Sequence, residues 1–207
     1  MLKFLSQALS IIFHPLLLTS YALLLIFLLP GYLSMLPYSY KRTVFIVFSL
    51  ITTAAPVVFV FLMYQLKVIQ NLSLEDRKER VFPLVTSFIF YLSAYIMALR
   101  FPVELPNLVL GILLTAALSS LVGLLLNFLL KVSLHSLAFA AFISFFTSYI
   151  FLFQINAVNF IIALILLSGI TAAARLFLNS HKPLEVYTGF LAGAALGLMP
   201  YLIQFHF

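Results

Sequence analysis

Residues 107–130 read NLVLGILLTAALSSLVGLLLNFLL, a run of 24 residues that contains no charged side chain. An α-helix needs about 20 apolar residues to cross the hydrocarbon core of a bilayer. Further apolar runs occupy residues 4–29, 43–66, 82–99, 134–153, 157–176 and 187–205. We therefore predict an all-α, polytopic integral membrane protein: a bundle of six to seven transmembrane helices that forms a single transmembrane domain over residues 1–207.

The composition supports a membrane protein over any water-soluble fold. Hydrophobic residues make up 65% of the 207 residues and charged residues 8%, against roughly 25% charged residues in a soluble domain. The chain lacks cysteine, which excludes thiol chemistry but leaves the redox compartment undecided. The net charge of +6 indicates topology signals and contact with membrane lipids rather than nucleic-acid binding. We expect the plasma (inner) membrane of a bacterium to be its location.

Two local patterns interrupt the apolar runs. Pro15 disfavours a helical conformation at His14, so the residues before this break could form a short interfacial helix. His14 itself is either a helix-break residue, a buried histidine with a hydrogen bond, or a contact to substrate. Gly189, Gly193 and Gly197 recur every fourth residue in the last run, which predicts close helix packing or an assembly face.

Most of the polar chemistry falls on one side of the predicted bundle. The connections after the second, fourth and sixth runs share a face, because successive spans alternate in direction. Ionisable groups at the edge of a membrane are costly and mark function by default. This face, which we call the site face, holds Lys67, Glu75, Asp76, Arg77, Lys78, Glu79, Arg80, Lys131, His135, Arg175, His181, Lys182 and Glu185.

The most informative cluster lies at residues 174–185, with the sequence ARLFLNSHKPLE. A carboxylate such as Glu185 beside one ring nitrogen of His181 would fix the tautomer and stabilise the imidazolium, which makes the histidine a base or a nucleophile. Arg175 could hold an anion through two parallel hydrogen bonds. The alternative interpretation is that these residues are interfacial anchors that end two helices.

A second cluster, at residues 131–135, begins the fifth run. A helix N-terminus favours bound phosphate, and Ser133 is the predicted N-cap there. His135 could protonate a leaving oxygen or merely face lipid headgroups, and Lys131 adds a cation. The charged segment before the third run supplies Arg77 and Arg80 as further cations, unless it is a solvated loop.

These clusters resemble the motifs of the type-2 phosphatidic acid phosphatase superfamily of membrane lipid phosphatases. The family pattern is Lys-x6-Arg-Pro, then Pro-Ser-Gly-His, then Ser-Arg-x5-His-x3-Asp. Arg175, His181 and Glu185 reproduce the spacing of the third motif, and Ser133 and His135 match the second. The resemblance extends over about residues 75–185.

The match to the family is incomplete. Arg80 has Pro83 three residues later and matches the first motif only in part. Two apolar runs separate the first motif from the second, which departs from the family layout. Further departures are Ser73 in place of Lys, Val132 in place of Pro, Leu134 in place of Gly, Ala174 in place of Ser and Glu185 in place of Asp.

The resemblance implies a mechanism. His181 attacks phosphorus and forms a phosphohistidine, Glu185 orients His181, and His135 protonates the departing lipid oxygen and then helps to activate water. The residues that would hold phosphate are Arg175, Arg80, Lys131 and Ser133, with Arg77 and His14 as further candidates. The scheme needs no metal and no cofactor. The substrate would be a lipid phosphate or diphosphate of the isoprenyl diphosphate, phosphatidic acid or phosphatidylglycerophosphate type.

Other functions remain open at this point. A catalytically inactive relative that binds lipid phosphate would account for Val132 and Leu134, and a small transporter would account for helix breaks at Pro15 and Pro56, although the sequence has no inverted repeat. A phosphotransferase would use the same residues as a phosphatase. The orientation is open as well, because the cations of the site face serve either topology or phosphate binding. The sequence does not fix the oligomeric state.

Overall fold

The predicted apolar runs are helical in the computed structural model, which describes residues 1–71, 74 and 76–204, with side chains as far as Met199. No β-strand occurs among these residues. The elements are α1 (Leu2–Ile12), α2 (Pro15–Leu28), the 3₁₀ helix η1 (Tyr32–Met35), α3 (Tyr38–Ser49), the π-helix η2 (Leu50–Ala54), α4 (Ala55–Gln65), α5 (Val81–Leu99), α6 (Asn107–Leu129), α7 (Leu134–Leu152), α8 (Val158–Phe177) and α9 (Pro183–Gln204).

The lengths of these helices confirm an integral membrane protein built as a helical bundle. Within the described residues, five segments are long and apolar enough to cross a membrane: Tyr38–Gln65, α5, α6, α7 and α8. The α1–α2 pair would make a sixth span, although its helices are bent by 59° at a break. The apolar part of α9 with described side chains, Pro183–Met199, is shorter.

The span at Tyr38–Gln65 contains Pro56 and nevertheless continues as a single helical segment. Proline removes one main-chain donor from a helix and its ring crowds the preceding turn. The π-helix η2 ends two residues before Pro56, and its wider turn accommodates the ring without a break. The break that the sequence suggested at Pro56 is therefore a local π-turn.

Within the predicted transmembrane domain, the residues divide into two compact units. The first unit comprises Met1–Leu18 and Leu130–Phe207, of which residues after Gln204 are not described, and the second comprises Thr19–Leu129. The first unit contains α1, α7, α8 and α9. The second contains most of α2 and all elements from η1 to α6.

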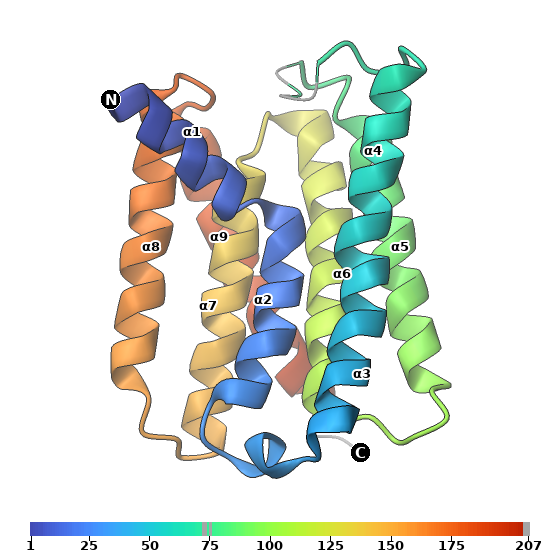
Figure 1. Ribbon diagram of the computed structural model, residues 1–207. Coiled ribbons are helices and arrows are strands. Elements are labelled where there is room, and N and C mark those ends of the chain that lie inside the picture. The colour runs from blue at the N-terminus through green and yellow to red at the C-terminus, as the bar shows by residue number, and fades with distance from the viewer. Residues whose placement is uncertain (72–73, 75, 205–207) are drawn as a thin grey trace. The chain divides into compact units, whose positions relative to one another are not determined.

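Close packing of α9 on α7 organises the first unit. A Cβ atom on Gly189 would lie 2.7 Å from the carbonyl oxygen of Ser133, and Cβ atoms on Gly193 and Gly197 would overlap the carbonyl oxygens one and two turns further along α7. The two helices therefore run parallel with their backbones in contact. This confirms the helix-packing role of the glycines, and the partner is α7. In the same unit, α1 packs against α8, near the end from which the chain leads to α9 (Figure 1).

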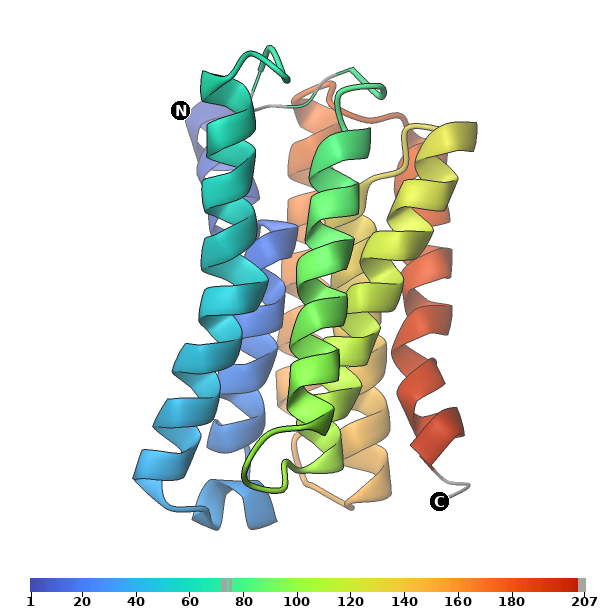
Figure 2. The ribbon, with the colours of Figure 1, turned by 90° about the vertical axis from the view of Figure 1, so that its right-hand side faces the viewer.

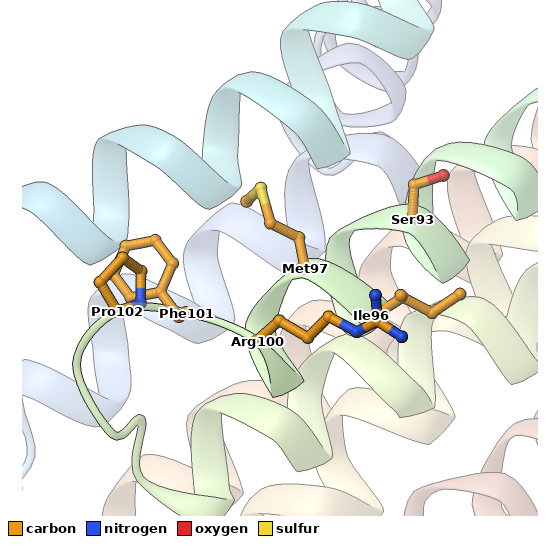
Figure 3. Close-up of a pocket in the computed structure, with 6 residues that line it drawn as sticks. All are labelled: Ser93, Ile96, Met97, Arg100, Phe101 and Pro102. Atoms are coloured by element: carbon orange, nitrogen blue, oxygen red, sulfur yellow. The ribbon is translucent and has the colours of Figure 1, made fainter.

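The second unit is organised by α5 and α6, which lie side by side (Figure 2). The hydroxyl of Ser120 donates to the carbonyl of Leu84 across this pair at 3.0 Å. A shallow groove of about 470 Å³ opens at the end of α5 (Figure 3). It is lined by Ser93, Ile96, Met97, Arg100, Phe101 and Pro102. The groove lies at the opposite end of α5 from Arg80, away from the charged segment.

Candidate functional site

The predicted clusters at residues 131–135 and 174–185 come together in the first unit. Because α7 and α9 are parallel and in register, their N-termini lie at the same end of the unit. The main-chain N–H of Ser133 donates to the carbonyl of Glu185 at 3.1 Å and ties the two helix starts to each other. Arg175 lies in the last turn of α8, next to the connection that leads to α9. Two positive helix ends and one guanidinium therefore gather in this region.

His181 and Glu185 form the hydrogen-bonded pair expected from their spacing. The Nδ1 atom of His181 lies 2.9 Å from Oε2 of Glu185 and 3.1 Å from the carbonyl oxygen of Lys131. Both partners only accept hydrogen bonds, so Nδ1 carries a proton, and in the neutral ring Nε2 has the lone pair. The His181 side chain is 2% exposed, which limits its rotation and hydration. This is the arrangement of an oriented base or nucleophile.

Glu185 is itself held in place. Its Oε2 atom also accepts the main-chain N–H of Lys182 at 3.1 Å. The carboxylate lies in the first turn of α9, where the helix dipole stabilises negative charge. Glu185 is therefore a fixed anion against which an imidazolium at His181 would be stabilised.

Ser133 is the N-cap of α7, as predicted. Its Oγ accepts the main-chain N–H of Ser136 at 3.4 Å and the hydroxyl of Ser136 at 3.0 Å. Ser133 is fully buried. The hydroxyl proton of Ser133 is not used in these two bonds, because Ser133 accepts in both. The cap thus fixes the start of α7 directly before His135.

His135 connects the start of α7 to the N-terminal helix. Its Nε2 atom lies 3.0 Å from the carbonyl oxygen of Ser10 in α1, and its ring meets that of His14 edge-on, with centroids 5.7 Å apart and planes at 84°. His135 is buried. Arg175 and His181 are both close enough to His135 to interact with it electrostatically. His135, Arg175 and His181 therefore lie in one neighbourhood of the first unit.

His14 belongs to the same neighbourhood. It lies at the break between α1 and α2 and is exposed, and its Nδ1 atom accepts the main-chain N–H of Leu16 at 3.3 Å. Arg175 also interacts electrostatically with His14. Of the interpretations offered for this residue, the helix break is confirmed, burial is wrong because the side chain is exposed, and contact with substrate stays a prediction.

The charged segment before the third apolar run lies in the second unit. Arg80 is buried, and its Nε donates to the carbonyl of Leu74 at 2.8 Å. Arg77 donates from Nη1 to the carbonyl of Leu129 at 3.1 Å, while its own carbonyl accepts from Nδ2 of Asn127 at 2.9 Å. Both arginines therefore bind main-chain carbonyls and fasten the charged segment within its own unit.

The acidic residues of this segment also bind main chain. Asp76 accepts the N–H of Lys78 at 2.9 Å, and Glu79 accepts the N–H of Gln70 at 3.2 Å. Ser73 and Glu75 lie outside the described residues. Among the residues that are described, no three His, Asp or Glu side chains are grouped as the ligands of a metal ion would be.

Sequence reasoning missed the main-chain groups of the site. The carbonyls of Ser10 and Lys131 each bond a histidine ring, and neither appears in a side-chain motif. One signal was present at Ser10, because a proline five residues later disturbs the helical hydrogen bonds of the preceding turn. Nothing comparable marks Lys131.

The assembled site of the first unit combines three imidazoles, one guanidinium, one carboxylate and two helix N-termini. Such a set can bind an anion and supplies an oriented imidazole nitrogen to attack it. No protein-family model matches the chain, and no curated protein or solved structure is significantly similar to it.

Proposed function

We propose that the protein is an integral membrane lipid phosphatase that hydrolyses a lipid phosphate or diphosphate through a phosphohistidine intermediate. The observation that carries the proposal is the His181–Glu185 pair, 2.9 Å apart, in the same neighbourhood as Arg175 and His135. A histidine that only anchors a helix end at the membrane interface requires neither burial of its ring nor a carboxylate partner. The spacing of the second and third motifs supports the same chemistry.

In the first step, Nε2 of His181 attacks phosphorus, an N–P bond forms, and the bond from phosphorus to the lipid oxygen breaks. His135 takes up a second ring proton when the anionic substrate binds, because a nearby negative charge favours the imidazolium, and it transfers this proton to the departing oxygen. Glu185 stabilises the positive charge that develops on the His181 ring. In the second step, His135 takes a proton from water, which attacks phosphorus and releases inorganic phosphate. His181 then regains its lone pair.

Phosphate binding is assigned by charge. Arg175 holds phosphoryl oxygens near both histidines, since a guanidinium and a phosphate match in geometry. Lys131, Ser133 and His14 lie in the same unit and add donors. The substrate is an isoprenyl diphosphate, phosphatidic acid or phosphatidylglycerophosphate type of lipid, with its tail among the helices. The plasma membrane of a bacterium is the proposed location.

The test is release of inorganic phosphate from these three lipid classes by the purified protein and by His181→Ala. We expect the parent to release phosphate from at least one class and to carry an acid-labile, alkali-stable phosphoryl group during turnover, and His181→Ala to do neither. Lys182→Gln is the matched control, because only the main-chain N–H of Lys182 bonds Glu185. Equal release by parent and His181→Ala would refute the phosphohistidine route.

A catalytically inactive, lipid-phosphate-binding protein is the second candidate. Leu134 stands where the family motif has glycine, and Ser133 is fully buried beside it, so close approach of phosphate to this main chain is less open than in the motif. Tight binding of lipid phosphate without turnover would favour this candidate. The transporter alternative is weakened, because the helix at Pro56 is continuous.

A further inference from the structure

The break between α1 and α2 leaves the carbonyl of Ser10 without its helical partner. In an α-helix this carbonyl would accept the N–H of His14, four residues later. Instead, the N–H of His14 donates to the carbonyl of Ile11 at 3.2 Å. Pro15, which would be the partner of Ile11, has no N–H to give. The proline thus shifts the last hydrogen bond of α1 by one residue and releases the acceptor of Ser10.

His135 fills this vacated position. Its Nε2 lies 3.0 Å from the Ser10 oxygen, and both residues are buried, so water does not readily replace the bond. A carbonyl oxygen accepts only, and therefore Nε2 is the protonated nitrogen of the neutral ring. The lone pair of His135 is then on Nδ1. His181 has the opposite tautomer, because its Nδ1 faces two acceptors.

We infer that the main chain of Ser10 is a positioning group for His135: it fixes the Nε2–H tautomer of the resting protein, so that Nδ1 is the atom that takes up a proton when the substrate binds and then passes this proton to the departing oxygen. This inference rests on the proposed phosphatase function for the identity of the reaction. The tautomer itself is a property of the chain and does not depend on turnover. Ser10 acts through His135 and does not touch the reacting atoms.

Two further contacts keep this arrangement in place. The edge-on ring of His14, at a centroid distance of 5.7 Å, crowds a rotation of the His135 ring that would exchange its nitrogen positions. α1 packs against α8 with Ser6 and Ser10 buried, while Phe4, Leu5 and Ile12 are exposed. The polar side of α1 therefore faces the protein and its apolar side faces outward, the arrangement expected of a helix at the edge of a bilayer.

The experiment measures histidine side-chain nitrogens by ¹⁵N NMR in the full-length protein in lipid nanodiscs, with His135→Gln to assign the signals. In the parent we expect His135 to show a protonated Nε2 and an unprotonated Nδ1. Pro15→Ala restores an N–H at residue 15, so the N–H of His14 can return to the Ser10 carbonyl and displace His135. We expect its two nitrogen signals to move toward the average of the two tautomers.

Pro56→Ala is the matched control, because it also changes a proline within an apolar helical segment but lies in the second unit. We expect it to leave the His135 signals unchanged. For phosphate release, Pro15→Ala is expected to lower kcat at least tenfold with KM within about twofold, a part of the roughly 100-fold that a positioned general acid contributes.

A protonated Nδ1 on His135 in the parent would overturn the inference, and that measurement needs no variant. Unchanged His135 signals in a folded Pro15→Ala protein would overturn it as well. If the parent shows the expected tautomer but releases phosphate from none of the three lipid classes, the proposed function fails while the positioning by Ser10 stands. The two failures are therefore distinguishable.

Discussion

Replacing Gly193 by alanine tests whether the α7–α9 contact builds the site. The added Cβ would overlap the carbonyl oxygen of Leu137 and lie 2.8 Å from Cβ of Ala140. The Leu137 carbonyl is part of the α7 main chain, and the Ala140 side chain has no rotatable bond that could move its Cβ. Neither neighbour can therefore move aside. α9 must therefore shift away from α7. Overpacking of this kind costs about 1–3 kcal/mol of unfolding free energy.

The same shift would stretch the contacts that join the two helix starts. The bond from Ser133 N–H to the Glu185 carbonyl and the bond from His181 Nδ1 to the Lys131 carbonyl both bridge the two segments. We therefore expect phosphate release to fall together with stability. For a chain of 207 residues, each kcal/mol corresponds to a melting temperature lower by about 2–4 °C.

The assay is thermal unfolding of Gly193→Ala in nanodiscs beside Gly169→Ala. A Cβ on Gly169, in α8, meets nothing within 4 Å, so this variant adds the same methyl group without a clash. It is expected to be neutral or slightly stabilising, because alanine favours the helix by roughly 0.5–1 kcal/mol over glycine. Equal melting temperatures for the two variants would refute the close-contact argument.

Two further predictions concern the ends of the same helices. Glu185→Gln is expected to lower kcat for phosphate release about 100-fold or more, because it removes the charge that stabilises a cationic His181. Glu185→Asp should retain most activity. Equal kcat for the Gln and Asp variants in the phosphate assay would contradict this role. Ser133→Ala removes the N-cap of α7 and is expected to cost about 1 kcal/mol of unfolding free energy, measured as a lower melting temperature; an unchanged melting temperature would contradict the stabilising role of this cap.

The spans could be predicted from the sequence because the bilayer sets their length. Residues 107–130 needed only a count of apolar positions, and α6 occupies almost the same range. Ser133 was predictable because an N-cap depends on a local side chain and the next few N–H groups. The glycines every fourth residue predicted a close helix contact, although their spacing alone did not name α7 as the partner.

The rest could not be predicted because it depends on main-chain acceptors and on wider helical turns. Arg77 and Arg80 were expected to hold phosphate on the basis of charge, and the structure shows each donating to a carbonyl within its own unit. Every residue has a main-chain carbonyl, so the sequence does not mark which carbonyl will bind a side chain. The partner of His135 at Ser10 and the partner of His181 at Lys131 could therefore not be predicted either. At Pro56, the residue that usually breaks a helix is accommodated by a π-turn, which composition does not reveal.

The parallel register of α7 and α9 has a consequence for biogenesis. α9 is translated about fifty residues after α7. In the nascent chain, α7 therefore enters the membrane before the α9 glycines that pack against it. Until α9 arrives, lipid tails must cover the strip of small side chains on α7, at Ser136, Ala140 and Ser144, that the glycines later contact. The contacts that join His181 and Glu185 to the start of α7 therefore form only after α9 has been inserted.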